Sequence, residues 1–286
     1  MSPPQPLPRV VACMPAWKAE AFIEPTLQSL AAQTYPNLHV LIADDASPDG
    51  TWALCQRFAQ GRANFELHRH PANLGWIGNV NWLLQHAEAD YLFFAFHDDP
   101  LEPDYVQALV DALEHAPDAV LAFSDAVVDF RGAQEAWVRT LSFTALDGLN
   151  TAHARLAVLA QRPSQWWLPN RGLLRQTAVR RVGGMRRHLA GEFCADWPWL
   201  LHLSLLGAFV RVPQPLVHKV WRQEGLSKSW RWSAFKRLGV TLACLTEILR
   251  ADLPLAERLS LAWDFSRHWA RRGARSVGRR LRLTGA

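Results

Sequence analysis

Short apolar runs alternate with amphipathic stretches through the first half of the chain. The runs are too short for helices, end at polar residues, and predict strands of a largely buried sheet. They lie at 9–14, 38–43, 65–68, 91–96 and 119–123. The stretches between them repeat apolar residues with helical spacing and predict helices at 22–33, 51–59, 77–87 and from Pro103 onward. Strand and helix in this order predict an α/β fold with a mainly parallel, Rossmann-like sheet flanked by helices.

An acidic pair follows the most aromatic of these runs. Tyr91–Phe96 is followed by His97, Asp98 and Asp99, and Pro100 then prevents the strand from continuing. In open α/β sheets, ligands bind just beyond the carboxyl ends of the strands. Two adjacent carboxylates at such a place predict a site for a hard divalent cation. The alternative is that Asp98 caps a turn and Asp99 faces water.

A second acidic loop, Asp44–Thr51 (DDASPDGT), follows the predicted strand at 38–43. Its acids and hydroxyls can accept hydrogen bonds from a base or a ribose. Its alternative interpretation is a turn and a helix N-cap, since Asp, Ser and Thr are the usual capping residues. Asp125 ends a third strand in the same way, so we expect acids from three strands at one edge of the sheet.

The composition is that of a soluble globular protein, with 49% hydrophobic and 20% charged residues among 286. The four cysteines form no CxxC pair and indicate buried thiols in a reducing compartment. We find no signal peptide and no apolar window of the roughly 18 residues needed to span a bilayer, so we expect a cytoplasmic protein. The motifs GxGxxG and GxxxxGKS are absent, which weighs against a dinucleotide dehydrogenase and a P-loop NTPase.

The net charge of +5 is concentrated at the C-terminus, where seven arginines and no acid follow from Arg267 onward. The rest of the chain is close to neutral, which argues against a nucleic-acid-binding core. The tail mixes basic and apolar residues and predicts contact with an anionic membrane surface. The alternative is a solvated tail.

Four motifs in order resemble those of glycosyltransferase family 2. They are MPAWKA at 14–19, QTYPN at 33–37, DDASPDGT at 44–51, and Asn73, Gly75 and Asn81 of an NxGxxxxxN segment. With the acidic strand end, the resemblance covers roughly residues 9–105. It implies the GT-A fold and an inverting transfer of a sugar from a nucleotide sugar.

The resemblance implies a nucleotide pocket at the carboxyl ends of the first strands. Asp44 would bind the base, and the backbone of Pro15 and Ala16 would line the pocket. Asp45 and Asp98 would also lie at the nucleotide. The expected donor is a sugar carried on uridine or deoxythymidine diphosphate.

The family's DxD or DxDD motif implies a metal at the acidic pair. Asp99, helped by Asp98, would hold Mn²⁺ or Mg²⁺, which would neutralise the leaving diphosphate as a Lewis acid. Phe96 stands where the first acid of the motif is expected, so one carboxylate is missing.

The second half resembles the acceptor side of the family. VGGM at 182–185 resembles a VGGF turn, and Asp196 follows where the family places its catalytic base. Ala195 replaces the Glu that usually precedes this Asp. The alternative for Asp196 is an N-cap of the helix predicted at 198–206, and Glu192 is the second candidate base.

The segment Trp221–Ser227 resembles the YRxHxxS loop that closes on the donor diphosphate and the acceptor in this family. The resemblance implies that Trp221, Arg222 and Lys228 lie at the diphosphate and acceptor, while Glu224 replaces the His. Many of the fourteen tryptophans lie in this half. They suit a glycan or lipid-linked acceptor, because sugar rings stack on aromatic rings; the alternative is that they pack in the core.

We therefore expect a glycosyltransferase domain over 1–225 and a basic helical extension over 226–286. The domain would hold a nucleotide-sugar half at about 1–125 and an acceptor half at about 126–225. The predicted function is metal-dependent, inverting sugar transfer to a glycan or lipid-linked acceptor in surface polysaccharide synthesis, in the cytoplasm or at the inner face of the membrane. The alternative is a non-catalytic relative that keeps a nucleotide-sugar pocket, which the two missing carboxylates would favour.

Overall fold

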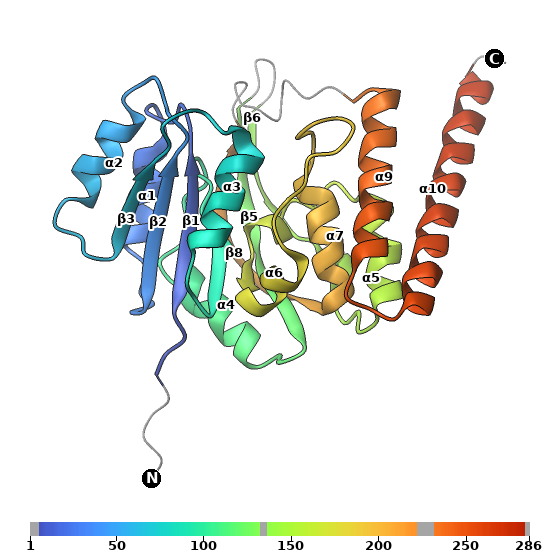
Figure 1. Cartoon of the computed structure of the whole chain (residues 1–286), viewed down its shortest axis with the longest axis horizontal. Coiled ribbons are helices and arrows are strands. Elements are labelled where there is room, and N and C mark those ends of the chain that lie inside the picture. Colours follow the sequence, from blue (N-terminus) through green and yellow to red (C-terminus); the bar gives the residue numbers. More distant parts are fainter. Residues whose placement is uncertain (1–5, 132–135, 222–231, 284–286) are drawn as a thin grey trace, which may run out of the picture.

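The structure is a computed structural model that describes residues 6–131, 136–221 and 232–283. Its described residues form one sheet of eight strands in the order β3-β2-β1-β4-β7-β5-β6, with β8 paired to β5. Figure 1 shows β1, β2 and β3 at one end of the molecule and the C-terminal helices at the other. The predicted α/β class, with a mostly parallel sheet flanked by helices, is confirmed.

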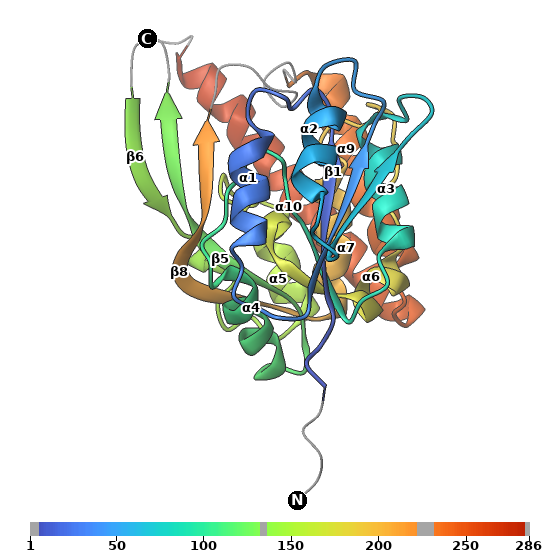
Figure 2. The same cartoon turned by 90° about the vertical axis from the view of Figure 1, so that its left-hand side faces the viewer.

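The first half has the predicted alternation of strands and helices. The strands are β1 (Val10–Ala16), β2 (Leu38–Asp44), β3 (Phe65–Arg69) and β4 (Tyr91–Phe94), and the helices are α1 (Ile23–Ala31), α2 (Thr51–Ala59), α3 (Gly75–His86) and α4 (Tyr105–Glu114). β1 pairs in parallel with both β2 and β4, and β2 pairs in parallel with β3. Figure 2 shows α1 and α2 on one side of these strands and α3 on the other.

The second half contains three strands that the sequence did not predict. Its strands are β5 (Ala119–Arg131), β6 (Ala136–Leu141), β7 (Leu173–Arg175) and β8 (Ala208–Trp221). β7 runs antiparallel to both β4 and β5, and β6 runs antiparallel to β5. β5 and β8 pair in parallel along almost their whole lengths. Together with β6 they lie at one edge of the molecule (Figure 2).

Short helices connect these strands, and two longer helices follow them. They are the 3-10 helices η1 (Thr144–Leu146) and η2 (Pro169–Arg171), and the α-helices α5 (Ala152–Leu159), α6 (Gln176–Val182), α7 (Asp196–Leu206), α9 (Ala234–Arg250) and α10 (Leu255–Leu283). α9 packs on α7, and α10 packs on α9 and α5. No helix in the described part of the chain is long and apolar enough to cross a membrane. The domain boundary expected after residue 225 lies outside the described residues.

Burial explains why β1 and β4 lie at the centre of the sheet. Every residue of both strands is buried, as expected for strands covered by helices on both faces. After β4 the chain turns along β8, where Leu101 forms an isolated bridge with Val217 and His218 N donates to Pro100 O at 2.8 Å. This pairing lays β8 beside the acidic pair that follows β4.

Candidate functional site

The carboxyl ends of β2, β1 and β4 lie side by side and carry the predicted nucleotide residues. Ala16 is opposite Asp44 in the register of β1 and β2, and Asp45 N donates to Ala16 O at 2.9 Å. On the other side of β1, the ring of His97 is hydrogen-bonded through Nδ1 to Pro15 O at 2.9 Å. The structure therefore brings together the segments that the sequence placed at the nucleotide.

Asp44 holds a carboxylate oxygen without a hydrogen-bond donor. Its side chain is fully buried, and Oδ2 accepts from Ser47 N at 3.2 Å and lies 3.2 Å from Arg69 Nε. Oδ1 has no hydrogen-bond partner among the described residues. A buried acceptor without a donor is costly, so an N–H group of a ligand would be favourable there.

Asp45 and Asp49 show that part of the acidic loop is structural. Asp45 Oδ1 accepts from Leu74 N at 2.7 Å, and its carbonyl accepts from Asn73 Nδ2 at 3.1 Å. Asp49 Oδ1 accepts from both the N and the hydroxyl of Thr51, where α2 begins. Asp49 therefore stabilises a local turn before α2, whose N-cap is Gly50, while Asp45 joins this loop to the segment before α3.

The acidic pair after β4 is held by two cations. Lys219 Nζ of β8 donates to Asp98 Oδ2 at 2.9 Å and lies 2.7 Å from Asp99 Oδ1, an ion pair without hydrogen-bond geometry. Arg171 Nε donates to Asp99 Oδ2 at 2.9 Å. Burial acts to raise the pKa of Asp98, but Lys219 and His97 hold this pKa below its usual value. Asp99 does not face water, since it is 1% exposed, whereas the Asp98 side chain is 32% exposed.

The positive charges around the acidic pair disfavour a divalent cation there. The Arg171 guanidinium lies 4.4 Å from the centre of the Phe96 ring, beside the position where the family motif has its first acid. Mn²⁺ or Mg²⁺ between Asp98 and Asp99 would meet the Lys219 ammonium at close range, and like charges repel strongly at partly buried sites. The described residues also contain no group of three or more His, Cys, Asp or Glu side chains suited to a metal. Metal binding at this pair stays a prediction that these neighbours disfavour.

Asp196, the predicted base, is the first residue of α7, and the N-cap position belongs to Ala195. Its Oδ2 accepts from Asn170 Nδ2 at 3.0 Å. Burial raises the pKa of Asp196 to about 6, and the nearby Arg171 partly opposes this rise. A carboxylate with this pKa is ionised at neutral pH and a better proton acceptor than an ordinary Asp.

Glu192, the second candidate base, is hydrogen-bonded to the start of α3. Its carboxylate accepts from Trp76 N at 3.2 Å and Ile77 N at 3.4 Å, and pairs with Arg187 at 2.9 Å. Gly75 precedes these residues with a φ of +78°, and a Cβ there would lie 2.8 Å from Glu192. A carboxylate on the first N–H groups of a helix stabilises the helix, so Glu192 has a structural role.

The other predicted positions lie on β5 and β8 or outside the described residues. Asp125 accepts two hydrogen bonds from Arg211 and joins β5 to β8. Trp221 ends β8 and is 38% exposed. Arg222 and Lys228 fall outside the described residues.

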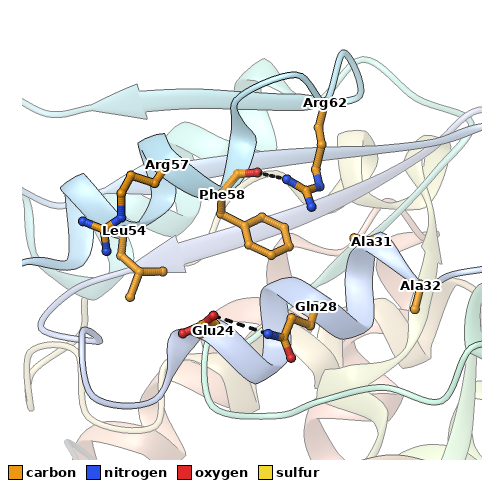
Figure 3. A pocket seen from close by; sticks show the side chains of 8 residues that line it. All are labelled: Glu24, Gln28, Ala31, Ala32, Leu54, Arg57, Phe58 and Arg62. Atoms are coloured by element: carbon orange, nitrogen blue, oxygen red, sulfur yellow. Dashed lines mark hydrogen bonds between the residues drawn. The ribbon is translucent and has the colours of Figure 1, made fainter.

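A surface hollow between two helices is a separate feature. It lies between α1 and α2, has a volume of about 600 Å³, and is shown in Figure 3. Its lining includes Glu24, Gln28, Arg57 and Arg62 and contains none of the predicted site residues. The acidic cluster, not this hollow, is the candidate site.

Comparison with known proteins agrees with the resemblance to glycosyltransferase family 2 found in the sequence. Residues 11–152 match the family model described as glycosyl transferase family 2. The chain belongs to this family. The matched part of the family 2 domain runs from β1 to the start of α5, so it contains Asp44, Asp98 and Asp99 but not Asp196.

Curated glycosyltransferases align with about a third of this chain. Glycosyltransferase GlyA of Streptococcus pneumoniae is 27% identical over 101 residues, which is 35% of this chain and 14% of that protein. The putative teichuronic acid biosynthesis glycosyltransferase TuaG of Bacillus subtilis is 28% identical over 100 residues, 35% of this chain and 40% of that protein. The alignments thus span less than half the length of these relatives.

Solved structures show that the family 2 domain has the GT-A fold. S. aureus TarS 1–349 in complex with UDP-GlcNAc matches with a TM-score of 0.68 and 17% identity, covering 91% of this chain and 72% of that chain. The mannosyltransferase PcManGT of Pyrobaculum calidifontis, in complex with GDP-Man and Mn²⁺, matches with a TM-score of 0.54 and 15% identity, covering 99% and 80%. At these identities the likeness establishes the fold alone.

Proposed function

We propose that the chain transfers a sugar, with inversion, from a nucleoside diphosphate sugar to a glycan or lipid-linked acceptor in surface polysaccharide synthesis. One observation carries this proposal: two consecutive residues of η2 connect the donor and acceptor sides. Asn170 donates to Asp196, and Arg171 donates to Asp99. The candidate base and the acidic pair, distant in sequence, therefore belong to one site.

The chemistry needs a proton acceptor on one side of the sugar and a departing diphosphate on the other. Asp196 takes the proton of the acceptor hydroxyl while that oxygen attacks the anomeric carbon. The bond from the anomeric carbon to the diphosphate oxygen breaks, and its electron pair leaves with the diphosphate. A single displacement from opposite sides inverts the anomeric carbon.

The nucleotide is proposed to be of the uridine or deoxythymidine type. Uracil and thymine both carry an N3–H donor, and Asp44 Oδ1 is a buried acceptor without a donor among the described residues. Solved relatives hold UDP-GlcNAc, UDP or GDP-Man, which supports a nucleotide sugar as the donor class.

We expect UDP and dTDP to stabilise the folded protein by about 2.7 kcal/mol at 100 times their dissociation constants. Thermal unfolding with UDP, dTDP, CDP and GDP measures this effect. Asp44→Asn should weaken UDP and dTDP binding, because the amide places an N–H donor where the base needs an acceptor. Glu66→Gln, the same change at an exposed position of β3, should have no effect.

The outcomes separate the candidate functions. Stabilisation by no nucleotide, in the presence or absence of Mn²⁺, would contradict the proposal. Binding without any release of nucleoside diphosphate from the donor or transfer to an acceptor would favour the non-catalytic relative instead.

We also propose that the C-terminal helices contact an anionic membrane surface. Leu255, Leu259 and Trp263 lie at helical spacing on α10 and are 61%, 54% and 66% exposed. The arginine-rich segment from Arg267 onward follows them. An exposed apolar stripe next to basic residues is typical of a helix that lies in the headgroup region.

Leu259→Glu with Trp263→Glu should reduce sedimentation with phosphatidylserine vesicles, because two charges would enter the apolar stripe. Raising the salt concentration should weaken binding of the unchanged protein. Val138→Glu, at a position of β6 that is 65% exposed, is the matched control. Equal sedimentation of the double variant and the control would exclude α10 as the contact surface.

A further inference from the structure

Two fixed cations stand where the family motif predicts a metal. The Lys219 ammonium contacts both Asp98 and Asp99, and the Arg171 guanidinium contacts the second oxygen of Asp99. Two negative and two positive side chains thus form a cluster without net formal charge. We call Lys219 and Arg171 the cation pair.

A backbone hydrogen bond of the neighbouring residue positions Lys219. Lys219 follows His218, whose N–H donates to Pro100 O at 2.8 Å, directly after the acidic pair. Its side chain is 15% exposed and lies between the two carboxylates. The ammonium is therefore positioned before any ligand binds.

Arg171 is held from several directions. Its NH1 donates to Trp167 O at 3.3 Å, and its carbonyl accepts from the hydroxyl of Tyr105, which is fully buried. The guanidinium lies 4.4 Å from the Phe96 ring centre and 5.0 Å from that of Trp167. Aromatic faces attract a cation, so Phe96 supports Arg171 at the position where the motif has a carboxylate.

Both cations keep donors for a further acceptor. An ammonium has three N–H groups, and within the described part of the chain Lys219 donates one hydrogen bond, to Asp98. Arg171 uses Nε and NH1, while its NH2 has no partner among the described residues. The oxygens of a diphosphate suit such donors, because charge-assisted hydrogen bonds to phosphate are short and strong.

We propose that Lys219 and Arg171 replace the divalent cation, so that nucleotide binding and sugar transfer need no metal. As the bond from the anomeric carbon to the diphosphate breaks, the added negative charge on the diphosphate is neutralised by these two side chains. The proton of the acceptor goes to Asp196, so no further reactant is required. The inference rests on the proposed function, because it assigns the groups that meet that diphosphate.

The first test uses the unchanged protein. Calorimetry should give the same UDP and dTDP affinities in EDTA and in excess Mn²⁺, and release of diphosphate from the donor should proceed at equal rates. Binding or release that appears only with Mn²⁺ would overturn the inference and leave the proposed function intact. No binding under either condition would overturn both.

The second test removes the ammonium. In EDTA, Lys219→Met should weaken UDP or dTDP binding by about 10- to 100-fold, the range for a hydrogen bond to a charged group. The same variant should gain affinity for Mn²⁺ alone, because Asp99 Oδ1 accepts no hydrogen bond from the described residues and loses its cation. Paramagnetic resonance of free Mn²⁺ measures this gain, which the unchanged protein should lack.

Matched variants control for the loss of one positive charge. Arg57→Met removes a cation from an exposed position of α2 and should change neither nucleotide nor Mn²⁺ binding. Lys219→Arg should restore most of the nucleotide affinity. Unchanged affinity in Lys219→Met would overturn the inference, and the experiment in EDTA decides it independently if this variant fails to fold.

Discussion

Replacing Asp196 by Asn should lower sugar transfer by about 10²–10⁴-fold, the usual contribution of a general base. Asn has the same shape and retains an oxygen for the hydrogen bond from Asn170. Nucleotide affinity should therefore be unchanged. No group would remain, however, to take the proton from the hydroxyl of the sugar acceptor. Steady-state transfer rates and calorimetry with UDP or dTDP measure the two effects separately.

Because the pKa of Asp196 is raised, both sugar transfer and stability should depend on pH in a way that Asp196→Asn removes. Burial raises this pKa to about 6, against the field of Arg171, so transfer should rise with pH through about 6 and then level off. The folded state binds the proton more tightly than the unfolded state, in which the pKa is near 3.9. The contribution of Asp196 to stability therefore falls as pH rises from about 4 to about 6. Asp196→Asn should lack this dependence and be more stable above pH 6.

Glu192→Gln is the matched control for the base. The Glu192 carboxylate accepts from the first N–H groups of α3 and pairs with Arg187. Glu192→Gln should therefore lower the free energy of unfolding by about 1 kcal/mol. Transfer should remain near normal. A large loss of transfer in Glu192→Gln, with near-normal transfer in Asp196→Asn, would assign the base to Glu192.

The donor half of the fold could be predicted because its signals are local. Each strand is an apolar run that ends in a polar turn, and each helix repeats its apolar residues with its own period. The predicted helix at 51–59 coincides with α2, and the strand at 38–43 differs from β2 by one residue. The strand predicted at 91–96 ends at Phe94, because pairing of β4 with β1 stops opposite Cys13.

The cation pair could not be predicted, because its contacts are long-range. Lys219 lies 121 residues from Asp98 in the sequence and is one charged residue within the apolar end of β8. Arg171 lies 72 residues from Asp99. Neither residue belongs to a motif that we identified, and only the antiparallel insertion of β7 beside β4 brings η2 to the acidic pair. The available signal was a single basic residue within the largely apolar segment at 216–221.

Asp125 shows how acids that look alike in the sequence acquire different roles. It ends a predicted strand as Asp44 does, yet it accepts hydrogen bonds from Arg211 Nε at 2.7 Å and NH2 at 2.8 Å, and from Ser142 at 2.7 Å. Asp125 is 5% exposed and Arg211 is 16% exposed, so removing the carboxylate would leave a largely buried cation without its main partner. Acidic residues at strand ends thus present a buried acceptor without a donor among the described residues, hold the cation pair or join two strands, depending on their neighbours.

Asp125→Ala should therefore destabilise the fold by about 3–5 kcal/mol, the usual cost of breaking a buried ion pair. Urea unfolding measures this loss, and the nucleotide affinity of the folded protein should not change. Asp147→Ala is the matched control, since Asp147 pairs with the same Arg211 at 3.3 Å but is 41% exposed. An exposed pair contributes less than about 1 kcal/mol. Equal losses in the two variants would show that burial of the Asp125 pair does not stabilise the joint between β5 and β8. Weaker nucleotide binding by Asp125→Ala would instead extend the candidate site to the end of β5.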